Sequence, residues 1–137
     1  MKPKVSIITV VFNGENIIEK TMQSVFAQTY DNIEYIIVDG KSSDNTLSII
    51  EKYKEKISVL ISEKDKGLYD AMNKGLQVAT GDYVWFMNGG DQIADAQVLT
   101  KIFCRINGIM LLFLLIKIKK LLYMLMENLK ARHLLRD

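Results

Sequence analysis

The segment at residues 5–12, VSIITVVF, constrains the fold more than any other part of this chain, because it is almost entirely apolar and rich in β-branched side chains. Side chains of a strand point alternately to the two faces of its sheet, so a strand of this composition has to be covered on both faces. Such double coverage is typical of parallel sheets flanked by helices. We therefore expect this segment to be a buried strand of an α/β domain.

Strand-like and helix-like segments alternate along the first hundred residues. Apolar runs bounded by turn residues predict further strands at residues 33–38, 57–61 and 83–87. Apolar residues at helical spacing predict helices at residues 17–27, 47–53, 68–78 and 96–103, the second of them capped by Ser43 or Asp44. This alternation predicts a mostly parallel sheet with right-handed helical crossovers.

Each predicted strand is followed by polar or acidic residues next to glycine. The four junctions are Asn13-Gly14, Asp39-Gly40, the segment from Glu63 through Asp65 to Gly67, and Asn88-Gly89-Gly90-Asp91. The carboxyl ends of parallel strands share one edge of their sheet, and α/β proteins bind ligands there. A single Asp-Gly pair is a common turn, whereas four such junctions on one edge indicate a binding site.

Two familiar nucleotide-binding patterns do not fit this chain. The segment GKSS at residues 40–43 resembles the end of a Walker A loop, but the first glycine of that loop would fall at Tyr35, inside a predicted strand. The dinucleotide fingerprint GxGxxG is absent after the first strand. Carboxylates can instead bind the N–H edge of a base, ribose hydroxyls, or a Mg²⁺ or Mn²⁺ ion that holds a diphosphate.

Length and composition indicate one domain of ordinary size in a reducing compartment. The chain has 137 residues and a single cysteine, Cys104, which leaves no internal disulfide. No apolar leader precedes the first strand, so we expect a cytoplasmic protein. Residues 1–100 carry 10 lysines and 14 acids, whereas residues 101–137 carry 8 basic and 2 acidic residues. The net charge of +2 is small, and we expect no nucleic acid among the partners.

Three segments in this order, VSIITVVFN, IEYIIVDGKSSDNT and EKDKGLYDAMNKGLQVATGDYVWFMNGGD, resemble the N-terminal half of family 2 glycosyltransferases. The likeness covers residues 3–103 and is greatest to bacterial members that build capsular or exopolysaccharides. It implies a GT-A fold, which is a Rossmann-like, mostly parallel α/β sheet flanked by helices, here incomplete at the C-terminus. It also implies binding of a nucleoside-diphosphate sugar, of the UDP type, for inverting transfer in polysaccharide or cell-surface glycan synthesis.

The resemblance implies roles for residues near the strand ends. The nucleotide-binding residues expected from it are Val10, Phe12, Asn13, Asp39, Glu63, Asp65, Asn73, Asn88, Gly89 and Gly90. Val10 and Phe12 would line the base pocket, and Asp39 would hydrogen-bond the base. Glu63 and Asp65 would lie near the base and the ribose.

Departures from the family pattern predict a weakened enzyme. By the resemblance, Asn73 would pack beneath the diphosphate and Asp91 would hold Mg²⁺ or Mn²⁺, but the family usually has two or three acids at the metal motif, so the ion would be weakly held. Met72 stands where the family often has arginine, so the leaving diphosphate loses a cation. The family takes its general base from a second half. No such half follows here, so we identify no catalytic residue and expect impaired transfer.

Residues 104–137 differ from the preceding sequence and divide the chain into two parts. Residues 1–103 are the expected nucleotide-sugar-binding half-domain, and residues 104–137 are a basic, apolar helical tail. The longest apolar run of the tail, residues 109–116, is too short to cross a bilayer core of ~30 Å. Three interpretations stay open: a helix on an anionic membrane, a helix packed on the sheet edge, or the product of a frameshift or truncated gene, which the loss of family pattern favours.

Two functions of different classes also stay open. The chain is a glycosyltransferase-like donor-binding domain, or it is a non-catalytic nucleotide-binding or membrane-associated assembly module on the same fold. The apolar tail adds two expected associations, one with the inner face of the cell membrane and one with further copies of the chain.

Overall fold

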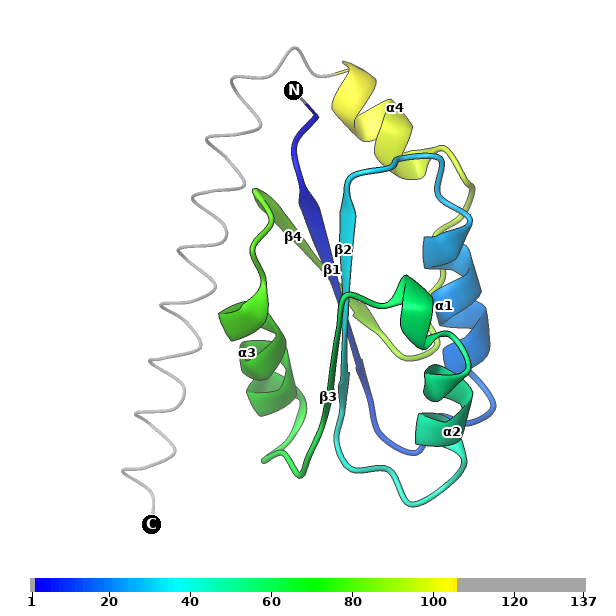
Figure 1. The fold of residues 1–137 in the computed structure, drawn as a ribbon, viewed down its shortest axis with the longest axis vertical. Coiled ribbons are helices and arrows are strands. Elements are labelled where there is room, and N and C mark those ends of the chain that lie inside the picture. The colour runs from blue at the N-terminus through cyan, green and yellow to red at the C-terminus, as the bar shows by residue number, and fades with distance from the viewer. Residues whose placement is uncertain (1, 106–137) are drawn as a thin grey trace.

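The computed structural model describes residues 2–105. The expectations for residues 106–137, which include most of the tail, lie outside the described residues. The elements follow one another as β1 (Val5–Val11), α1 (Ile18–Phe26), β2 (Ile33–Asp39), α2 (Thr46–Glu51), a 3₁₀ turn (Lys54–Lys56), β3 (Val59–Ser62), α3 (Leu68–Val78), β4 (Tyr83–Asn88) and α4 (Val98–Arg105) (Figure 1).

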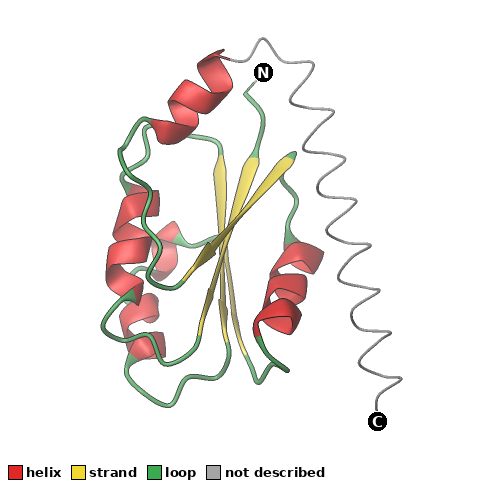
Figure 2. Ribbon diagram, turned by 180° about the vertical axis from the view of Figure 1, so that it is seen from behind, coloured by secondary structure: helices red, strands yellow, loops and turns green. Residues whose placement is uncertain are grey.

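The described strands form one parallel sheet in the order β3-β2-β1-β4, which confirms the predicted α/β class. β1 pairs with β2 on one side and with β4 on the other, and all seven of its residues are buried. Helices α1 and α2 cover one face of the sheet and α3 covers the opposite face (Figure 2). The apolar run at residues 5–12 therefore forms one of the two inner strands, as its composition requires.

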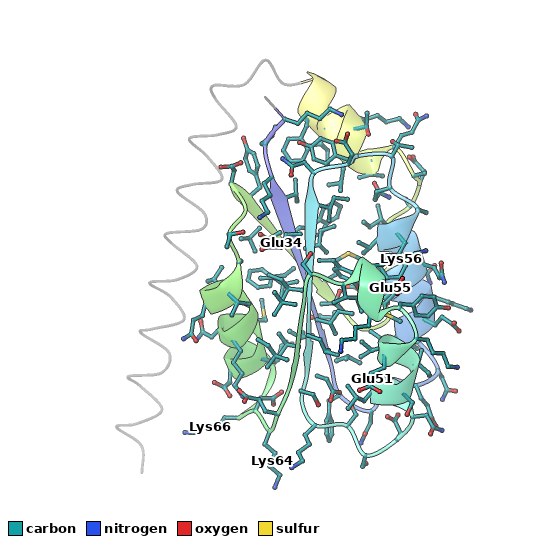
Figure 3. The ribbon with its side chains drawn as sticks, viewed as in Figure 1. Glu34, Glu51, Glu55, Lys56, Lys64 and Lys66 are labelled. Carbon is teal, nitrogen blue, oxygen red and sulfur yellow. The ribbon has the colours of Figure 1, made fainter. Side chains whose placement is uncertain are left out.

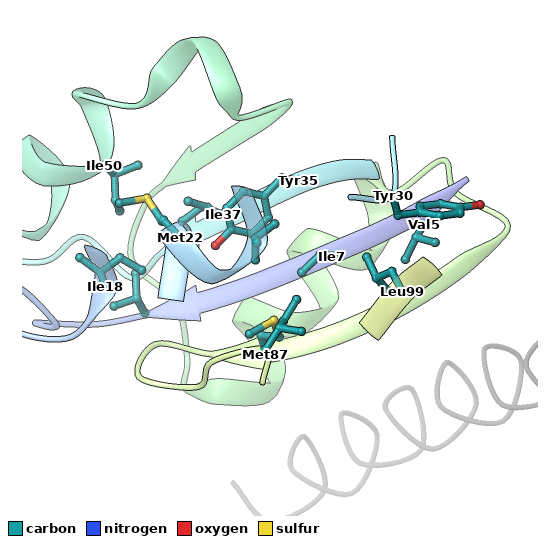
Figure 4. Close-up of a cluster of buried hydrophobic side chains, with 13 residues drawn as sticks. Val5, Ile7, Ile18, Met22, Tyr30, Tyr35, Ile37, Ile50, Met87 and Leu99 are labelled. Atoms are coloured by element: carbon teal, nitrogen blue, oxygen red, sulfur yellow. The ribbon is translucent and has the colours of Figure 1, made fainter. Parts of the chain in front are cut away.

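One apolar layer fixes α1 and α2 on the sheet. Ile18 and Met22 of α1 and Ile50 of α2 pack with Ile7 and Ile37 of the two inner strands, and none of these side chains is exposed (Figure 4). Residues four apart lie on one face of a helix, so the spacing of the two α1 residues is what directs that face to the sheet.

On the other face, α3 approaches the sheet closely at Gly75. A Cβ built on this glycine would lie 2.5 Å from Cγ2 of Ile8, far inside van der Waals contact. Ala71 and Leu76 flank the glycine and are buried against the same face. The absence of a side chain at residue 75 thus sets the height of α3 above the strands.

A buried carboxylate fastens the turn between α3 and β4 to the amino-terminal edge of the sheet. Glu34, labelled in Figure 3, accepts hydrogen bonds from the hydroxyl of Ser6 (2.5 Å) and from the amide and hydroxyl of Thr80 (both 2.8 Å). The Ser6 oxygen in turn accepts the N–H of Gly81 (2.8 Å). Burial opposes ionisation of Glu34, but these hydrogen bonds and the Lys4 ammonium at 3.7 Å outweigh it and lower the pKa of the carboxyl.

The second helix ends at Glu51 and not at residue 53. The third strand and the last helix begin later than predicted because local turns intervene. The third strand begins at Val59 and not at residue 57, since the 3₁₀ turn closes with a bond from the Ile57 N–H to the Lys54 carbonyl before the chain becomes extended. The last helix begins at Val98, two residues later than predicted. Among the described residues no helix is long and apolar enough to span a membrane.

The start of α2 also differs from the prediction. Asn45 holds the N-cap position without a side-chain bond, so neither Ser43 nor Asp44 is the cap residue. The Asp44 carboxylate nevertheless accepts the N–H of Thr46 (3.0 Å), the first residue of the helix. Desolvation opposes ionisation of Asp44, but this bond, a second one from the Thr46 hydroxyl (2.5 Å) and one from the Glu15 N–H lower the pKa of its carboxyl.

Candidate functional site

The carboxyl ends of all four described strands lie at one edge of the sheet, as the sequence predicts. Val11 of β1 pairs with Asp39 of β2, which pairs with Ser62 of β3, and Val10 pairs with Asn88 of β4. Adjacent strands are ~4.8 Å apart, so this row spans about three such steps. We call it the carboxyl edge, and it is the lower end of the sheet in Figure 1.

Asp39 lies at the centre of the carboxyl edge, but its side chain is fully buried. Its carboxylate accepts hydrogen bonds from the hydroxyl and the N–H of Ser42, and from the hydroxyl of Ser62 at 2.7 Å. Asp39 lies at the end of β2, where the sequence analysis expected a strand to end, and neither serine was predicted. The spacing Asp-x-x-Ser after a strand could have predicted the contact with Ser42, because Asp side chains in turns commonly accept hydrogen bonds from the backbone a few residues further on. Ser62 is 23 residues away and had no local signal.

Hydrogen bonds join the loop after β1 to the loop after β2. Asn13 adopts a positive φ of 48° and directs its Oδ1 to the N–H of Ser43 at 2.8 Å. Its own N–H donates to the hydroxyl of Ser42 at 2.8 Å, and Lys41 also has a positive φ, of 61°. Because β2 continues through Asp39, the loop holds no Walker A wrap, which agrees with the sequence argument.

A glycine leaves space between an aromatic ring and a carboxylate at this edge. A Cβ on Gly40 would lie 2.6 Å from Oδ2 of Asp65 and 3.4 Å from Cδ2 of Phe12, so these two side chains converge above the glycine. Phe12 is 65% exposed, which is unusual for an aromatic ring at the end of a buried strand. Val10, in contrast, is buried in the layer under α3, so its side chain lies in the core and not at the surface.

Glu63 lies beside α3 in an ion pair. Its carboxylate is 3.1 Å from Nζ of Lys74, which is also 3.5 Å from Asp70 and donates to the carbonyl of Lys64 (2.6 Å). Desolvation works against the charged lysine, but Glu63 and Asp70 together raise the pKa of Lys74. The sequence analysis missed Lys74, although its spacing of four residues from Asp70 on a helix predicts such a pair. Lys66, labelled in Figure 3, is exposed at the same end of the sheet.

The segment after β4 is a tight turn closed by Asp91. The Asp91 carboxylate accepts the N–H of Asn88 at 2.9 Å, and the Asn88 carbonyl accepts the N–H of Asp91. Gly90 has a φ of 104° and donates its N–H to the hydroxyl of Thr21 in α1. A Cβ on Gly89 would lie 2.9 Å from Cγ2 of Val11, so the turn needs both glycines.

Asp91 is exposed and does not cap α4, which begins seven residues later. Within residues 2–105 no three acidic, histidine or cysteine side chains gather as metal ligands. Asn73, expected beneath a diphosphate, lies inside α3 and is 96% buried, since only 4% of its surface is exposed. The structure therefore brings Phe12 and Asp65 together above Gly40, which follows Asp39, and buries Asn73 within α3.

Known proteins resemble this chain over most of the described region. The family model described as glycosyl transferase family 2 matches residues 6–108. A glycosyltransferase of Mycobacterium tuberculosis, itself uncharacterised, is 36% identical over 107 residues, which are 77% of this chain and 41% of that protein. TuaG of Bacillus subtilis, a glycosyltransferase ascribed to teichuronic acid biosynthesis, is 40% identical over 66% of this chain and 37% of its own. The chain thus spans about two fifths of the length of these curated relatives.

Solved structures give the same result for the fold. Residues 1–349 of TarS of Staphylococcus aureus, in complex with UDP-GlcNAc, superpose with a TM-score of 0.67 and 29% identity over 72% of this chain and 30% of that fragment. The mannosyltransferase PcManGT of Pyrobaculum calidifontis, in complex with GDP-Man and Mn²⁺, has a TM-score of 0.67 and 25% identity over 72% of this chain and 31% of its own. These likenesses confirm the resemblance and the GT-A fold predicted from the sequence.

Proposed function

Because the chain belongs to glycosyl transferase family 2, we propose that its carboxyl edge binds the nucleotide of a nucleoside-diphosphate sugar, with UDP favoured. The observation that carries this proposal is the convergence of Phe12 and Asp65 above Gly40, next to Asp39, where three strands end. An exposed ring beside carboxylates suits a base, which has a flat apolar face and an N–H edge. The solved complex of TarS with UDP-GlcNAc supports the choice of UDP.

In this proposal the base stacks on Phe12 and donates its N–H to Asp39. The carboxylate of Asp39 already accepts the hydroxyls of Ser42 and Ser62 and has no exposed surface. Base binding therefore requires the Ser42 hydroxyl to turn away, so that one hydrogen bond of the carboxylate is exchanged for another. The exchange leaves no buried acceptor unsatisfied, and its net cost is small.

We further propose that Asp91 contributes to a weak Mg²⁺ or Mn²⁺ site beside the diphosphate. The carboxylate is exposed, and only one of its oxygens is needed for the bond to the Asn88 N–H. A single carboxylate is a sparse ligand set for such an ion, so phosphate oxygens and water would supply most of the coordination. When bound, the ion neutralises charge on the leaving diphosphate. The Mn²⁺ in the solved mannosyltransferase complex supports this assignment.

The reaction proposed from family membership is inverting sugar transfer in the synthesis of a polysaccharide or cell-surface glycan. It requires a general base for the acceptor hydroxyl, and after Asp95 the sequence holds acids only at Glu127 and Asp137. We therefore propose that the 137-residue chain transfers sugar poorly. A second candidate function is nucleotide binding without transfer.

We also propose that residues 1–103 form a nucleotide-binding half-domain and that residues 104–137 form a separate tail. We propose that the chain lies in the cytoplasm at the inner face of the membrane, because its tail is basic and apolar.

Isothermal titration calorimetry with UDP and with GDP, each with and without Mn²⁺, tests the proposed function. We expect UDP to bind more tightly than GDP and more tightly with Mn²⁺ than without it. Asp31→Asn is a matched control, because Asp31 is an exposed acid that pairs with Lys2 (3.0 Å) at the opposite end of the sheet. Absence of a binding heat for either nucleotide under both conditions would contradict the proposal.

A further inference from the structure

The loop between β3 and α3, residues 63–67, carries Asp65, one of the side chains of the proposed nucleotide site. The ladder between β3 and β2 ends where this loop begins, with a bond from the Glu63 N–H to the Asp39 carbonyl (3.1 Å). Asp65 lies two residues beyond that bond. Its position therefore depends on contacts that the loop makes outside the ladder, and two side chains of α3 provide such contacts.

Lys74 of α3 holds the first part of the loop. Its ammonium donates to the carbonyl of Lys64 (2.6 Å) and lies 3.1 Å from the carboxylate of Glu63. A hydrogen bond from a charged donor is stronger than one between neutral groups, and the Lys74 side chain is only 20% exposed, so water screens its charge incompletely. The bond to the Lys64 carbonyl therefore restrains the backbone directly before Asp65.

Asp70 holds the second part of the loop. One oxygen of its carboxylate, Oδ2, accepts the N–H of Lys66 (2.9 Å) and lies 3.5 Å from the ammonium of Lys74. Residues four apart lie on one face of a helix, so Asp70 and Lys74 meet the loop together. The two residues of the loop that they bind, Lys64 and Lys66, are labelled in Figure 3 and flank Asp65 in the sequence. The backbone of Asp65 is thus restrained on both sides.

The two carboxylate oxygens of Asp65 have different surroundings. Oδ1 accepts the N–H of Gly67 (3.0 Å), which closes a turn within the loop. Oδ2 is directed to Gly40, where a Cβ would lie 2.6 Å from it. One oxygen therefore stabilises the loop, and the other lies beside the ring of Phe12 at the carboxyl edge. Movement of the loop backbone would displace that second oxygen from Gly40.

The helix that holds the loop is itself fixed on the sheet. Gly75, the residue after Lys74, packs so closely on Ile8 of β1 that a Cβ would lie 2.5 Å from its Cγ2. Lys74 therefore projects from the part of α3 whose distance from the sheet is most closely determined. Contacts run without interruption from β1 through α3 to the loop that carries Asp65.

We infer that Lys74 is a positioning residue of the nucleotide site: together with Asp70 it holds the loop at residues 63–67 so that Asp65 faces the nucleotide. Glu63 then serves as an ion-pair partner of Lys74 and does not contact the nucleotide. The family resemblance places both acids of the loop near the base and the ribose, whereas this inference gives them separate roles. It rests on the proposed function, because it takes the nucleotide site as given.

The first test measures the restraint of the loop without nucleotide. Lys74→Met keeps the apolar stem of the side chain and removes its charge. The amide protons of Lys66 and Gly67 should then exchange faster with solvent, as measured by NMR, while circular dichroism stays that of the parent chain. Lys101→Met is the matched control, because it removes a lysine that pairs with Asp95 (3.3 Å) in another part of the chain. Unchanged exchange at both amides in Lys74→Met overturns the inference.

The second test measures binding of UDP in the presence of Mn²⁺ by calorimetry. Lys74→Met should weaken binding by about three- to tenfold, as expected for residues coupled through shared contacts. Lys74→Arg keeps a positive charge and several donors, so it should bind UDP nearly as well as the parent, and Lys101→Met should bind like the parent. Equal affinity of Lys74→Met and the parent chain, or an equal loss in Lys74→Arg, overturns the inference.

A double-mutant cycle shows whether Lys74 acts through Asp65. In an Asp65→Asn background, Lys74→Met should weaken UDP binding much less than it does in the parent. Glu63→Gln should add nothing to the loss in Lys74→Met, because both changes break the same ion pair. Additive losses in either combination overturn the inference. Absence of a binding heat for UDP with the parent chain contradicts the proposed function instead, and the exchange measurement then still decides whether Lys74 holds the loop.

Discussion

The hydroxyl of Ser62, at the end of β3, donates a 2.7 Å hydrogen bond to Oδ2 of Asp39, at the end of β2. The carboxylate is thus held in position by a neighbouring strand and not only by its own loop. A group held in this way loses little further freedom when a ligand binds to it. This support fits the proposed role of Asp39 in base recognition, although its side chain is buried.

The first prediction concerns Asp39 itself. Asp39→Ala should weaken binding of UDP by about 1–3 kcal/mol, the cost of an unpaired donor on the base. Calorimetry measures the change, and circular dichroism checks that the variant is folded. Ser62→Ala is the matched control: it removes the support and keeps the carboxylate, so its effect should be smaller. Equal affinity of Asp39→Ala and the parent chain would show that the base lies elsewhere.

A second prediction concerns the metal. Asp91→Ala should remove the difference between UDP binding with and without Mn²⁺, because the proposed protein ligand is gone. Asp95→Asn should keep that difference, since Asp95 is an exposed acid that pairs with Lys101 (3.3 Å) a few residues further along the chain. Titrations of UDP at several Mn²⁺ concentrations distinguish the two variants. Retained metal dependence in Asp91→Ala would exclude Asp91 as a ligand.

Gly75→Ala should destabilise the fold by about 1–3 kcal/mol, as overpacking of a tight contact does. The added Cβ would lie 2.5 Å from Cγ2 of Ile8, and a central strand cannot withdraw from it. Alanine favours the helical conformation over glycine by ~1 kcal/mol, so the net loss is less than the full steric cost. Urea denaturation measures the change, with the exposed Gln77→Ala on the same helix as control. A variant more stable than the parent would show that α3 can move outward freely.

Glu34 should make stability depend on pH in the acid range. Its pKa is lowered in the folded state, so the folded chain binds fewer protons at this group than the unfolded chain. Its contribution is therefore complete above the ordinary glutamate pKa of 4.5 and is lost as pH falls through the lowered value. Glu34→Gln should be less stable near neutral pH by about 1–3 kcal/mol and should lack this acid-range loss.

Denaturation curves at a series of pH values measure this effect of Glu34. Glu51→Gln changes an exposed acid of α2 and should leave the curve as it is in the parent. If Glu34→Gln kept the full acid-range loss of the parent, another carboxylate would have to account for it.

The last prediction concerns turnover by the 137-residue chain. Transfer to saccharide or lipid-linked acceptors should be slow or absent, because a missing general base costs ~10²–10⁴ in rate. Hydrolysis of the donor should persist at a low rate, since water needs no acceptor site. Release of UDP from UDP-sugars with and without acceptor measures both reactions, and removal of residues 104–137 should leave UDP binding unchanged. Rapid transfer by the purified chain would refute the assignment.

Prediction from the sequence was most accurate where periodicity was strong. The run at residues 5–12 and the helix at Leu68–Val78 were located almost residue by residue, because both faces of β1 are apolar and α3 has a regular apolar stripe ending before a glycine. The third strand was shifted because a 3₁₀ turn has no clear pattern of its own. Short turns of this kind depend on where the following strand begins to pair, which is not a local property.

The polar contacts were predicted less well, since they join residues far apart in the sequence. Ser62 and Asp39 are 23 residues apart in the sequence, and no pattern within β3 indicates their hydrogen bond. Ser6 and Glu34 carried a signal that was not used: each is the second residue of its strand, and parallel strands that end together bring such positions into register. Two polar residues at equal positions in two buried strands predict a contact between them.

The adjacency of β1 and β4 has a consequence for folding during synthesis. Lys4 and Asp82 are 78 residues apart and are joined by a hydrogen bond beside the first pair of the β1–β4 ladder. The ribosome therefore releases β1 first and β4, the second neighbour of β1 in the sheet, last among these strands. At ~5–20 residues per second the delay lasts several seconds. Throughout that interval one side of β1 is available to other nascent chains. Conditions that slow translation or deplete chaperones should therefore lower the soluble yield of this chain more than that of a protein whose strands pair in the order of synthesis.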